Sequence, residues 1–356
     1  MTASVDTFVF APLATIIGVI LFWFIQLLLI DSYKYLLSKI WQKHEPFCKF
    51  TNFIGVLFQT ICHALGFTIT RSGIQHFHIT VDYGKVKPKK EKKGIFEWIA
   101  NAFLVVGPFF IPALIILLCL FILLPEAFAL QTGAYETFAE GLIHFGQNLH
   151  TFSVQLLGLL ASIDLAHPVQ FGFLFLLIFL GLGIRPSYVG KERKEKISMI
   201  YDLNNIKNLV IHKPYYIIIL LLLSYIIYYI SFVFNQYWYS AIFALFGMLS
   251  IISIIALLLS HAIVLLIKTT DEIPTPWSKI PYVLLFPAYI LPRILFLAHP
   301  FEYAKTVSLL TMILSVLISI ILLLKYKTNK FKTKTDNKPL KKVKDEATRP
   351  RKLIER

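Results

Sequence analysis

The sequence has few charged residues and few cysteines for its length. Only 15% of its 356 residues are Asp, Glu, Lys or Arg, whereas soluble domains carry about 25%. Its three cysteines, Cys48, Cys62 and Cys119, show no paired spacing, which argues against a disulfide framework and against a C-x-x-C redox or zinc module. No Walker loop, G-x-G-x-x-G turn, G-x-S-x-G elbow or spaced carboxylate pair is present. The sequence therefore offers none of the usual signatures of a soluble enzyme.

Long hydrophobic runs are what the sequence has instead. The chain is 57% hydrophobic, and a helix of about 20 apolar residues crosses a bilayer. Residues 8–30, 215–234, 239–267 and 306–324 have about this length, and shorter or interrupted runs occupy residues 51–66, 95–124, 168–184 and 281–297. We therefore predict an all-α polytopic membrane protein with seven or eight transmembrane helices and a small β-hairpin insert. The lipid bilayer is therefore its first predicted binding partner.

The net charge of +15 is concentrated in three patches that flank the hydrophobic runs. Residues 85–93 carry +5, residues 185–213 carry +4 and residues 325–356 carry +9, which leaves −3 for the rest of the chain. Positive charge beside membrane spans marks the cytoplasmic side, so the patches need no nucleic acid to explain them. We expect a multi-pass protein integral to the cell membrane with a cytoplasmic C-terminal tail. The orientation of the N-terminus depends on whether residues 51–66 cross fully, and stays open.

Composition divides the chain into five parts. They are residues 1–50, an N-terminal span and an interfacial helix ending near Pro46; 51–124, a helix, a β-hairpin and a kinked span; 125–167, an extracytoplasmic region; 168–324, a helical membrane bundle; and 325–356, a basic disordered tail. The extracytoplasmic region lacks Lys and Arg, and we expect one amphipathic or re-entrant helix near residues 152–165. Gly107-Pro108 and Pro112 predict a kink in residues 95–124, and Pro287 and Pro292 predict a break in residues 281–297.

A strand-like segment covers residues 67–86. β-branched and aromatic residues recur there, and Ser72-Gly73 is the expected turn of a hairpin. Unpaired strand edges are not tolerated against lipid. We therefore expect the hairpin to lie at the membrane surface or to be walled in by helices.

Three segments in this part of the chain form a suggestive series. HALGF spans residues 63–67, the hairpin sequence TITRSGIQHFHITVDYGKV follows it, and NAFLVVGPFF spans residues 101–110. Their order resembles the site-2 protease family of intramembrane zinc metallopeptidases, in which H-E-x-x-H on a membrane helix precedes a short β segment and a span with a Gly-Pro. The resemblance covers about residues 51–124 and implies a protease-like core in the membrane.

The departures from the family pattern decide what the resemblance implies for chemistry. His63 is present, but Ala64 stands where the glutamate general base would be and Phe67 where the second histidine would be. Two helix histidines and the glutamate are what bind zinc and activate water in such a motif. We therefore expect no catalytic residues and no required cofactor. The leading hypothesis is a non-catalytic, site-2-protease-like protein that binds a partner protein or a membrane segment.

Two alternatives stay open. His76 and His78 are two apart on the predicted strand, so they share one face, and with His63 they are candidate zinc ligands of an atypical membrane metalloprotease. The other alternative is a transporter of small molecules or lipids built on residues 281–297. Among ionisable residues in the spans, we expect Glu97 to pair with Lys92 or Lys93, and Arg293 to reach the interface.

Overall fold

The computed structural model describes residues 5–123, 135–184, 199–211, 213–236, 238–298 and 303–336. It forms two compact units, Met1–Leu265 and Leu266–Arg356. Almost every element is a helix, and the described residues contain one two-stranded sheet. Within these ranges, six helices are long and apolar enough to cross a membrane, or seven if a bent pair counts as one span. The predicted all-α polytopic membrane fold with a small hairpin is confirmed.

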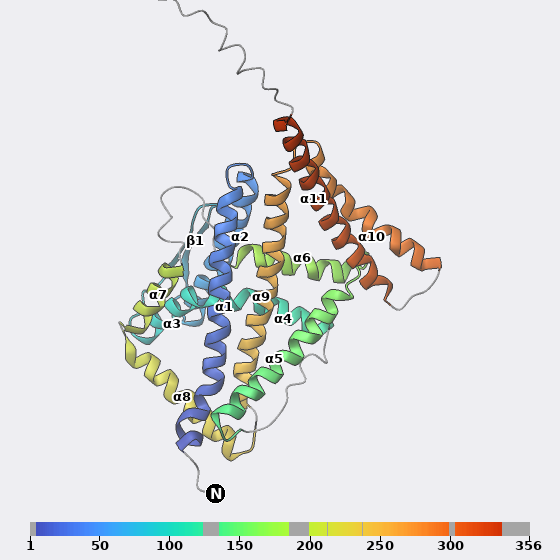
Figure 1. Ribbon diagram of the computed structural model, residues 1–356. Coiled ribbons are helices and arrows are strands. Elements are labelled where there is room, and N and C mark those ends of the chain that lie inside the picture. The colour runs from blue at the N-terminus through green and yellow to red at the C-terminus, as the bar shows by residue number, and fades with distance from the viewer. Residues whose placement is uncertain are drawn as a thin grey trace, which may run out of the picture. The chain divides into compact units, whose positions relative to one another are not determined.

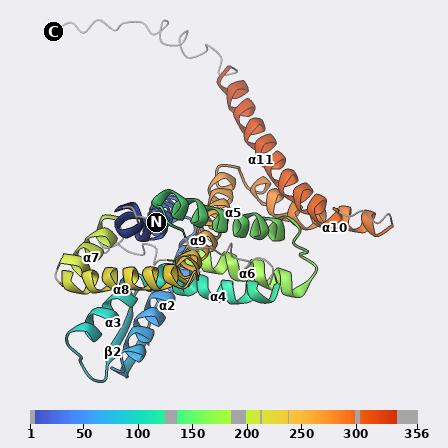
Figure 2. The same cartoon turned by 90° about the horizontal axis from the view of Figure 1, so that it is seen from below.

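Two long helices, α1 (Ala11–Ile40) and α9 (Trp238–Thr270), stand side by side in the first unit (Figure 1). A π-helical turn, Asp6–Phe10, precedes α1. Seen from below, α4 (Gly107–Leu123) and α6 (Pro168–Gly183) run across the direction of α1 and α9 (Figure 2). The part of α9 up to residue 265 belongs to this unit, and it contacts α1, α4, α5 and α6.

Small residues let α9 occupy this central position. Along one stripe it buries Ser250, Ser253, Ala256 and Ser260, each at most 1% exposed. Gly181 of α6 lies so close that a Cβ there would be 2.0 Å from the carbonyl oxygen of Ala256. Close approach of backbones at small residues is the main source of helix association in lipid. The stripe therefore allows α4 and α6 to approach α9 closely.

Helix α2 (Glu45–Ile69) is longer than expected. The prediction of an interfacial helix ending near Pro46 is wrong, because α1 continues to Ile40 and Pro46 lies in the first turn of α2. Proline is favoured there, since the N–H that it lacks has no partner within the helix in any case. The 25 residues of α2 extend about 37 Å at 1.5 Å per residue, which is enough to cross a bilayer.

The predicted hairpin is present, with a different turn. Strand β1 (Ile74–Ile79) pairs antiparallel with β2 (Gly84–Pro88), and residues 80–83 connect them. Ser72-Gly73 precedes β1, so the predicted position of the turn is wrong. Thr68 and Thr70 belong to the end of α2 instead, where their hydroxyls donate to the carbonyl oxygens four residues earlier. These local bonds let threonine close a helix.

The predicted kink is confirmed as a bend of 68° between α3 (Ile95–Val105) and α4.

Helix α5 (Phe138–Ala161) begins well before the expected residues 152–165, and a capping box of Thr137 and Glu140 fixes its start. Helices α7 (Met199–Ile211) and α8 (Pro214–Val233) follow, and a turn at Asn235, with φ of 49°, leads into α9. Residues 124–134 and 185–198, which include parts of the predicted extracytoplasmic region and of the second basic patch, lie outside the described residues.

The second unit contains a short 3₁₀ turn, Trp277–Lys279, and helices α10 (Ile280–Ala298) and α11 (Ala304–Asp336), which pack on each other. The predicted break at Pro287 and Pro292 is wrong, since both lie inside a continuous α10. Such prolines are tolerated in membrane helices because neighbouring groups satisfy the freed carbonyls. Residues 325–336 continue α11 rather than being disordered. Residues 337–356, the rest of the predicted tail, lie outside the described ranges.

Candidate functional site

The hairpin and the lysine loop after it are tied to the end of α2. The side-chain ammonium of Lys92 donates to the Thr70 carbonyl oxygen at 2.7 Å. The backbone amide of Lys90 donates to the Ser72 carbonyl oxygen at 3.0 Å, and the hydroxyls of Thr70 and Ser72 lie 2.9 Å apart. These bonds hold the lysine loop in a fixed position beside the first turn of α3.

A pocket of about 310 Å³ opens between this loop and α3. Its lining consists of Phe67, Ser72, Pro88, Lys90, Glu91, Lys92, Lys93, Phe96, Glu97, Ala100 and Asn101. We call it the lysine pocket. Its size falls in the range of ligand-binding cavities, which begins at about 300 Å³.

The lysine pocket has a positive charge balance. Three lysines and two glutamates line it, which gives +1. The Glu97 carboxylate is paired with Lys213 at 2.9 Å, and counting this lysine raises the sum to +2. The expected pairing of Glu97 with Lys92 or Lys93 is wrong, because Lys92 is bonded to Thr70 and the salt bridge is made from the start of α8. The partner could not be read from neighbouring sequence.

The start of α3 adds to this positive field. Its N-cap residue, Gly94, has φ of 78°, and no side chain caps the helix. The first-turn amides of a helix carry partial positive charge that favours anions. Phe96 and Glu97 of this first turn line the lysine pocket. The helix N-terminus and the lysines therefore favour the same sign of ligand charge.

One wall of the pocket is apolar. Phe67 comes from α2, and Phe96 and Ala100 come from α3. The ammonium of Lys92 lies 4.7 Å from the centre of the Phe96 ring, a distance typical of a cation–π contact. Phe96 itself is 47% exposed. The arrangement suits a molecule with an anionic group at one end and a hydrocarbon part at the other.

The predicted zinc ligands lie in two places. His76 and His78 share one face of β1, with ring centres 6.1 Å apart and nearly parallel planes, and both are exposed. His63 is on α2, where its ring packs on Phe67 at 4.5 Å. Within the described ranges, the structure brings no three His, Cys, Asp or Glu side chains close enough to hold a metal ion. Zinc binding by His63, His76 and His78 stays a prediction.

The glycines of the resemblance have a packing role. A Cβ on Gly66, within HALGF, would be 2.9 Å from the Cβ of Phe103 in α3. A Cβ on Gly107 would be 3.1 Å from the Cβ of Cys62, the neighbour of His63. Both glycines therefore mark where α2 meets the bent α3–α4 pair. Close packing is a sufficient reason for them without any catalytic role.

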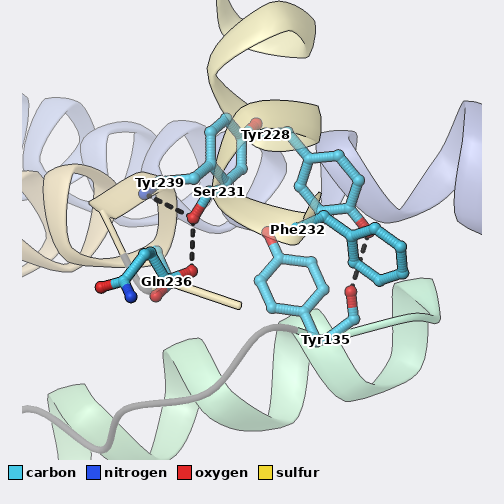
Figure 3. A pocket seen from close by; sticks show the side chains of 7 residues that line it. Tyr135, Tyr228, Ser231, Phe232, Gln236 and Tyr239 are labelled. Carbon is cyan, nitrogen blue, oxygen red and sulfur yellow. Dashed lines mark hydrogen bonds between the residues drawn. The ribbon is translucent and has the colours of Figure 1, made fainter. Parts of the chain in front are cut away.

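A second polar cluster surrounds the turn between α8 and α9 (Figure 3). The Tyr228 hydroxyl donates to the Tyr135 carbonyl oxygen at 2.8 Å, and the Ser231 hydroxyl donates to the Gln236 carbonyl oxygen at 2.5 Å. Burial raises the pKa of Tyr135 well above its usual range. The cavity among these side chains measures about 10 Å³, close to the space that one water occupies. It is too small for an organic ligand.

In the sequence, the lysine run indicates the orientation of the chain in the membrane but not a pocket. The pocket depends on Ser72, Phe67 and α3 lying beside that run, and this follows from the fold of the hairpin. Comparison of the chain with models of protein families, with curated proteins and with solved structures finds no match. The function is therefore argued from the geometry of the chain itself.

Proposed function

We propose that this integral membrane protein binds an anionic phospholipid, with its phosphate-bearing head group in the lysine pocket. The observation that carries the proposal is the pocket itself, which combines three lysines, an uncapped helix start and an apolar wall within about 310 Å³. The pocket adjoins the ends of two apolar helices, α2 and α3. A head group in this position would keep its acyl chains beside hydrophobic surface.

The chemistry of the lining fits a phosphate. Lysine ammonium groups make charge-assisted hydrogen bonds to phosphate oxygens, and the amides of a helix start provide further donors. Lys90 and Lys93 are exposed, and each basic residue near an anionic membrane contributes about 1 kcal/mol of attraction. The exposed Ile69 and Phe96 lie beside this region on α2 and α3, where they contact the acyl chains.

The proposal includes an orientation. Basic loops remain on the cytoplasmic side, and the cytoplasmic leaflet contains the anionic lipids. The lysine loop and Lys213, which belong to two of the three basic patches, meet through Glu97. In the proposed orientation this side is cytoplasmic and the membrane is the cell membrane.

The test is a lipid-dependent thermal shift of the purified full chain in non-ionic detergent. A ligand that binds only the folded state raises the melting temperature with its concentration. We expect phosphatidic acid to raise it and phosphatidylcholine to leave it unchanged. The double variant Lys90→Gln with Lys93→Gln should lose most of the shift. Lys85→Gln with Lys87→Gln, which removes the same charge from exposed positions of β2, should keep it.

Three results would count against the proposal. Equal shifts with both lipids would remove the requirement for negative charge. Equal losses in the two double variants would reduce the effect to general surface charge. A full shift with inorganic phosphate alone would show that the ligand is a soluble anion and that the hydrocarbon part is not recognised.

The predicted partner-binding role has one supporting observation. Along β1, Ile74 and Phe77 are exposed, and the strand pairs only with β2 among the described residues. An extended peptide can add to such a strand edge, which supports a role in binding a partner protein. Zinc analysis of the purified protein tests the metalloprotease alternative: stoichiometric zinc that is lost in His63→Ala would favour it, and absence of zinc would leave the non-catalytic role.

A further inference from the structure

A line of buried polar side chains follows the face of α1 that meets α9. Gln26 is 0% exposed, Tyr33 is 3% exposed and His261, on α9, is 8% exposed. Among the described residues, no hydrogen-bond partner reaches either amide atom of Gln26, the hydroxyl of Tyr33, the Nε2 of His261 or the indole nitrogen of Trp23. Four neighbouring side chains thus hold unsatisfied polar atoms inside an apolar bundle.

Contacts at three levels show that α1 and α9 run parallel in matched register. The Tyr239 hydroxyl donates to the Pro12 carbonyl oxygen at one end. Trp23 and Ser253 both contact Phe109 of α4, with ring centres 5.7 Å apart and a 3.1 Å hydrogen bond respectively. The rings of Tyr33 and His261 lie 5.5 Å apart near the other end.

The line is as long as the hydrocarbon core is thick. From Pro12 to Tyr33 is 21 residues of α1 (33 minus 12), and from Tyr239 to His261 is 22 residues of α9 (261 minus 239). At 1.5 Å per residue these segments extend about 32 Å, compared with about 30 Å for a bilayer core. The unsatisfied side chains of α1 lie between Trp23 and Tyr33, about 15 Å of this length. Hydrogen-bonded groups, the Thr15 hydroxyl and the Pro12 carbonyl oxygen, continue from there to the tyrosine cluster of Figure 3.

Polar atoms at this depth in the membrane are unfavourable unless they have hydrogen-bond partners. Each buried donor or acceptor without a partner costs about 1–3 kcal/mol, and lipid offers none. The His261 Nδ1 lies 2.8 Å from the Leu257 carbonyl oxygen, which only accepts, so Nδ1 carries the hydrogen and Nε2 presents a lone pair. Gln26 presents a donor and an acceptor, and Tyr33 presents a hydroxyl. Water is the small molecule that satisfies all of these groups.

We propose that the α1–α9 interface holds a file of water molecules and conducts protons across the membrane. A proton on a water molecule passes to His261 Nε2, forming an imidazolium and leaving neutral water. The same Nε2–H then passes its proton to the next water and returns the neutral ring, so no other bond changes. Gln26 and Tyr33 orient the water molecules. Proton relays are among the functions for which ionisable residues are placed inside membrane spans.

The test measures proton flux into vesicles that contain the purified full chain and a pH-sensitive dye. A potassium diffusion potential drives the flux, and protein-free vesicles set the background. We expect flux above background for the natural chain. His261→Phe and Gln26→Leu should lower it to background, since each removes a group that holds or orients water. Tyr35→Phe, on the exposed side of α1 with 61% of its surface free, should conduct as the natural chain does.

Folding is checked separately by thermal unfolding of each variant. Replacing an unsatisfied polar group by an apolar one of similar size leaves stability unchanged or improves it, so loss of flux with unchanged melting temperature supports the proposal. Flux at background in the natural chain would overturn it. Undiminished flux in both His261→Phe and Gln26→Leu would overturn it as well, and would leave the water file a structural feature only.

Discussion

Helices α8 and α9 are neighbours in sequence and similar in hydropathy, yet they occupy different environments. Their mean hydropathies are 2.4 and 2.8, but 11% of the residues in the most apolar window of α8 are buried, compared with 50% in α9. Helix α8 exposes large side chains such as Ile218, Leu222 and Ile226. Helix α9 presents its small-residue stripe to α4 and α6. Hydropathy thus selects the helices that enter the membrane, whereas side-chain size selects which of them lies at the centre.

The largest expected loss of stability comes from adding a methyl group to the close contact between α6 and α9. In Gly181→Ala the new methyl group would be 2.0 Å from the Ala256 carbonyl oxygen, so the helices must separate. We expect a loss of about 3 kcal/mol, the upper part of the range for overpacking. Gly172→Ala, on the same helix with nothing within 4 Å of the new Cβ, should not destabilise. Unfolding of both variants in mixed micelles measures the difference, and equal stabilities would contradict the close contact.

A smaller loss is expected when a large side chain is removed from α9. Leu257 is 1% exposed, whereas Leu222 of α8 is 58% exposed. Leu257→Ala leaves a cavity and should cost about 2 kcal/mol, at the low end for such changes because lipid replaces water as the reference for the lost side chain. Leu222→Ala leaves only lipid contacts and should cost almost nothing. The same unfolding assay compares the pair, and matching losses would mean that α8 is also packed.

The smallest expected effect is the loss of one hydroxyl. Ser253 donates to the Phe109 carbonyl oxygen across the α4–α9 contact, while Ser250 of the same helix donates to the Phe246 carbonyl oxygen within α9. Interhelical hydrogen bonds of the first kind contribute about 0.6 kcal/mol on average. Ser253→Ala should therefore be slightly destabilising and Ser250→Ala neutral. If Ser250→Ala were the worse of the two, the interhelical hydrogen bond would not contribute to the packing of α9.

Local sequence signals predicted much of the fold. Hydrophobic length identified the spans, and Gly107-Pro108 located the bend. Errors arose where the environment decides. Pro46 can follow the end of one helix or begin the next, and only the position at which α1 ends distinguishes the two. Pro287 and Pro292 suggest a break unless neighbouring helices support the chain.

The candidate sites were harder to predict than the fold. The lysines of the pocket were visible as charge, but their joint position with Phe67 and Phe96 depends on the hairpin packing back on α2. Gln26, Tyr33 and His261 were visible as polar residues within or beside apolar runs. Their alignment depends on α1 and α9 being adjacent although more than 200 residues separate them, and a single sequence contains no signal of that pairing.

The contact with the hairpin explains the low hydropathy of α2. The Asn52 amide donates to the Val81 carbonyl oxygen at 2.5 Å, and a Cβ on Gly84 would be 1.8 Å from the Thr60 hydroxyl. These polar residues of α2 face strand backbone rather than lipid, and the hydropathy of α2 is 1.4, while that of α8, α9 and α11 ranges from 2.4 to 2.9. A helix that packs against a pair of strands on one side therefore has a lower mean hydropathy than a helix of the same length that faces lipid. Scans that rank membrane segments by hydropathy will place such helices below the other spans of a protein, as they do α2 here.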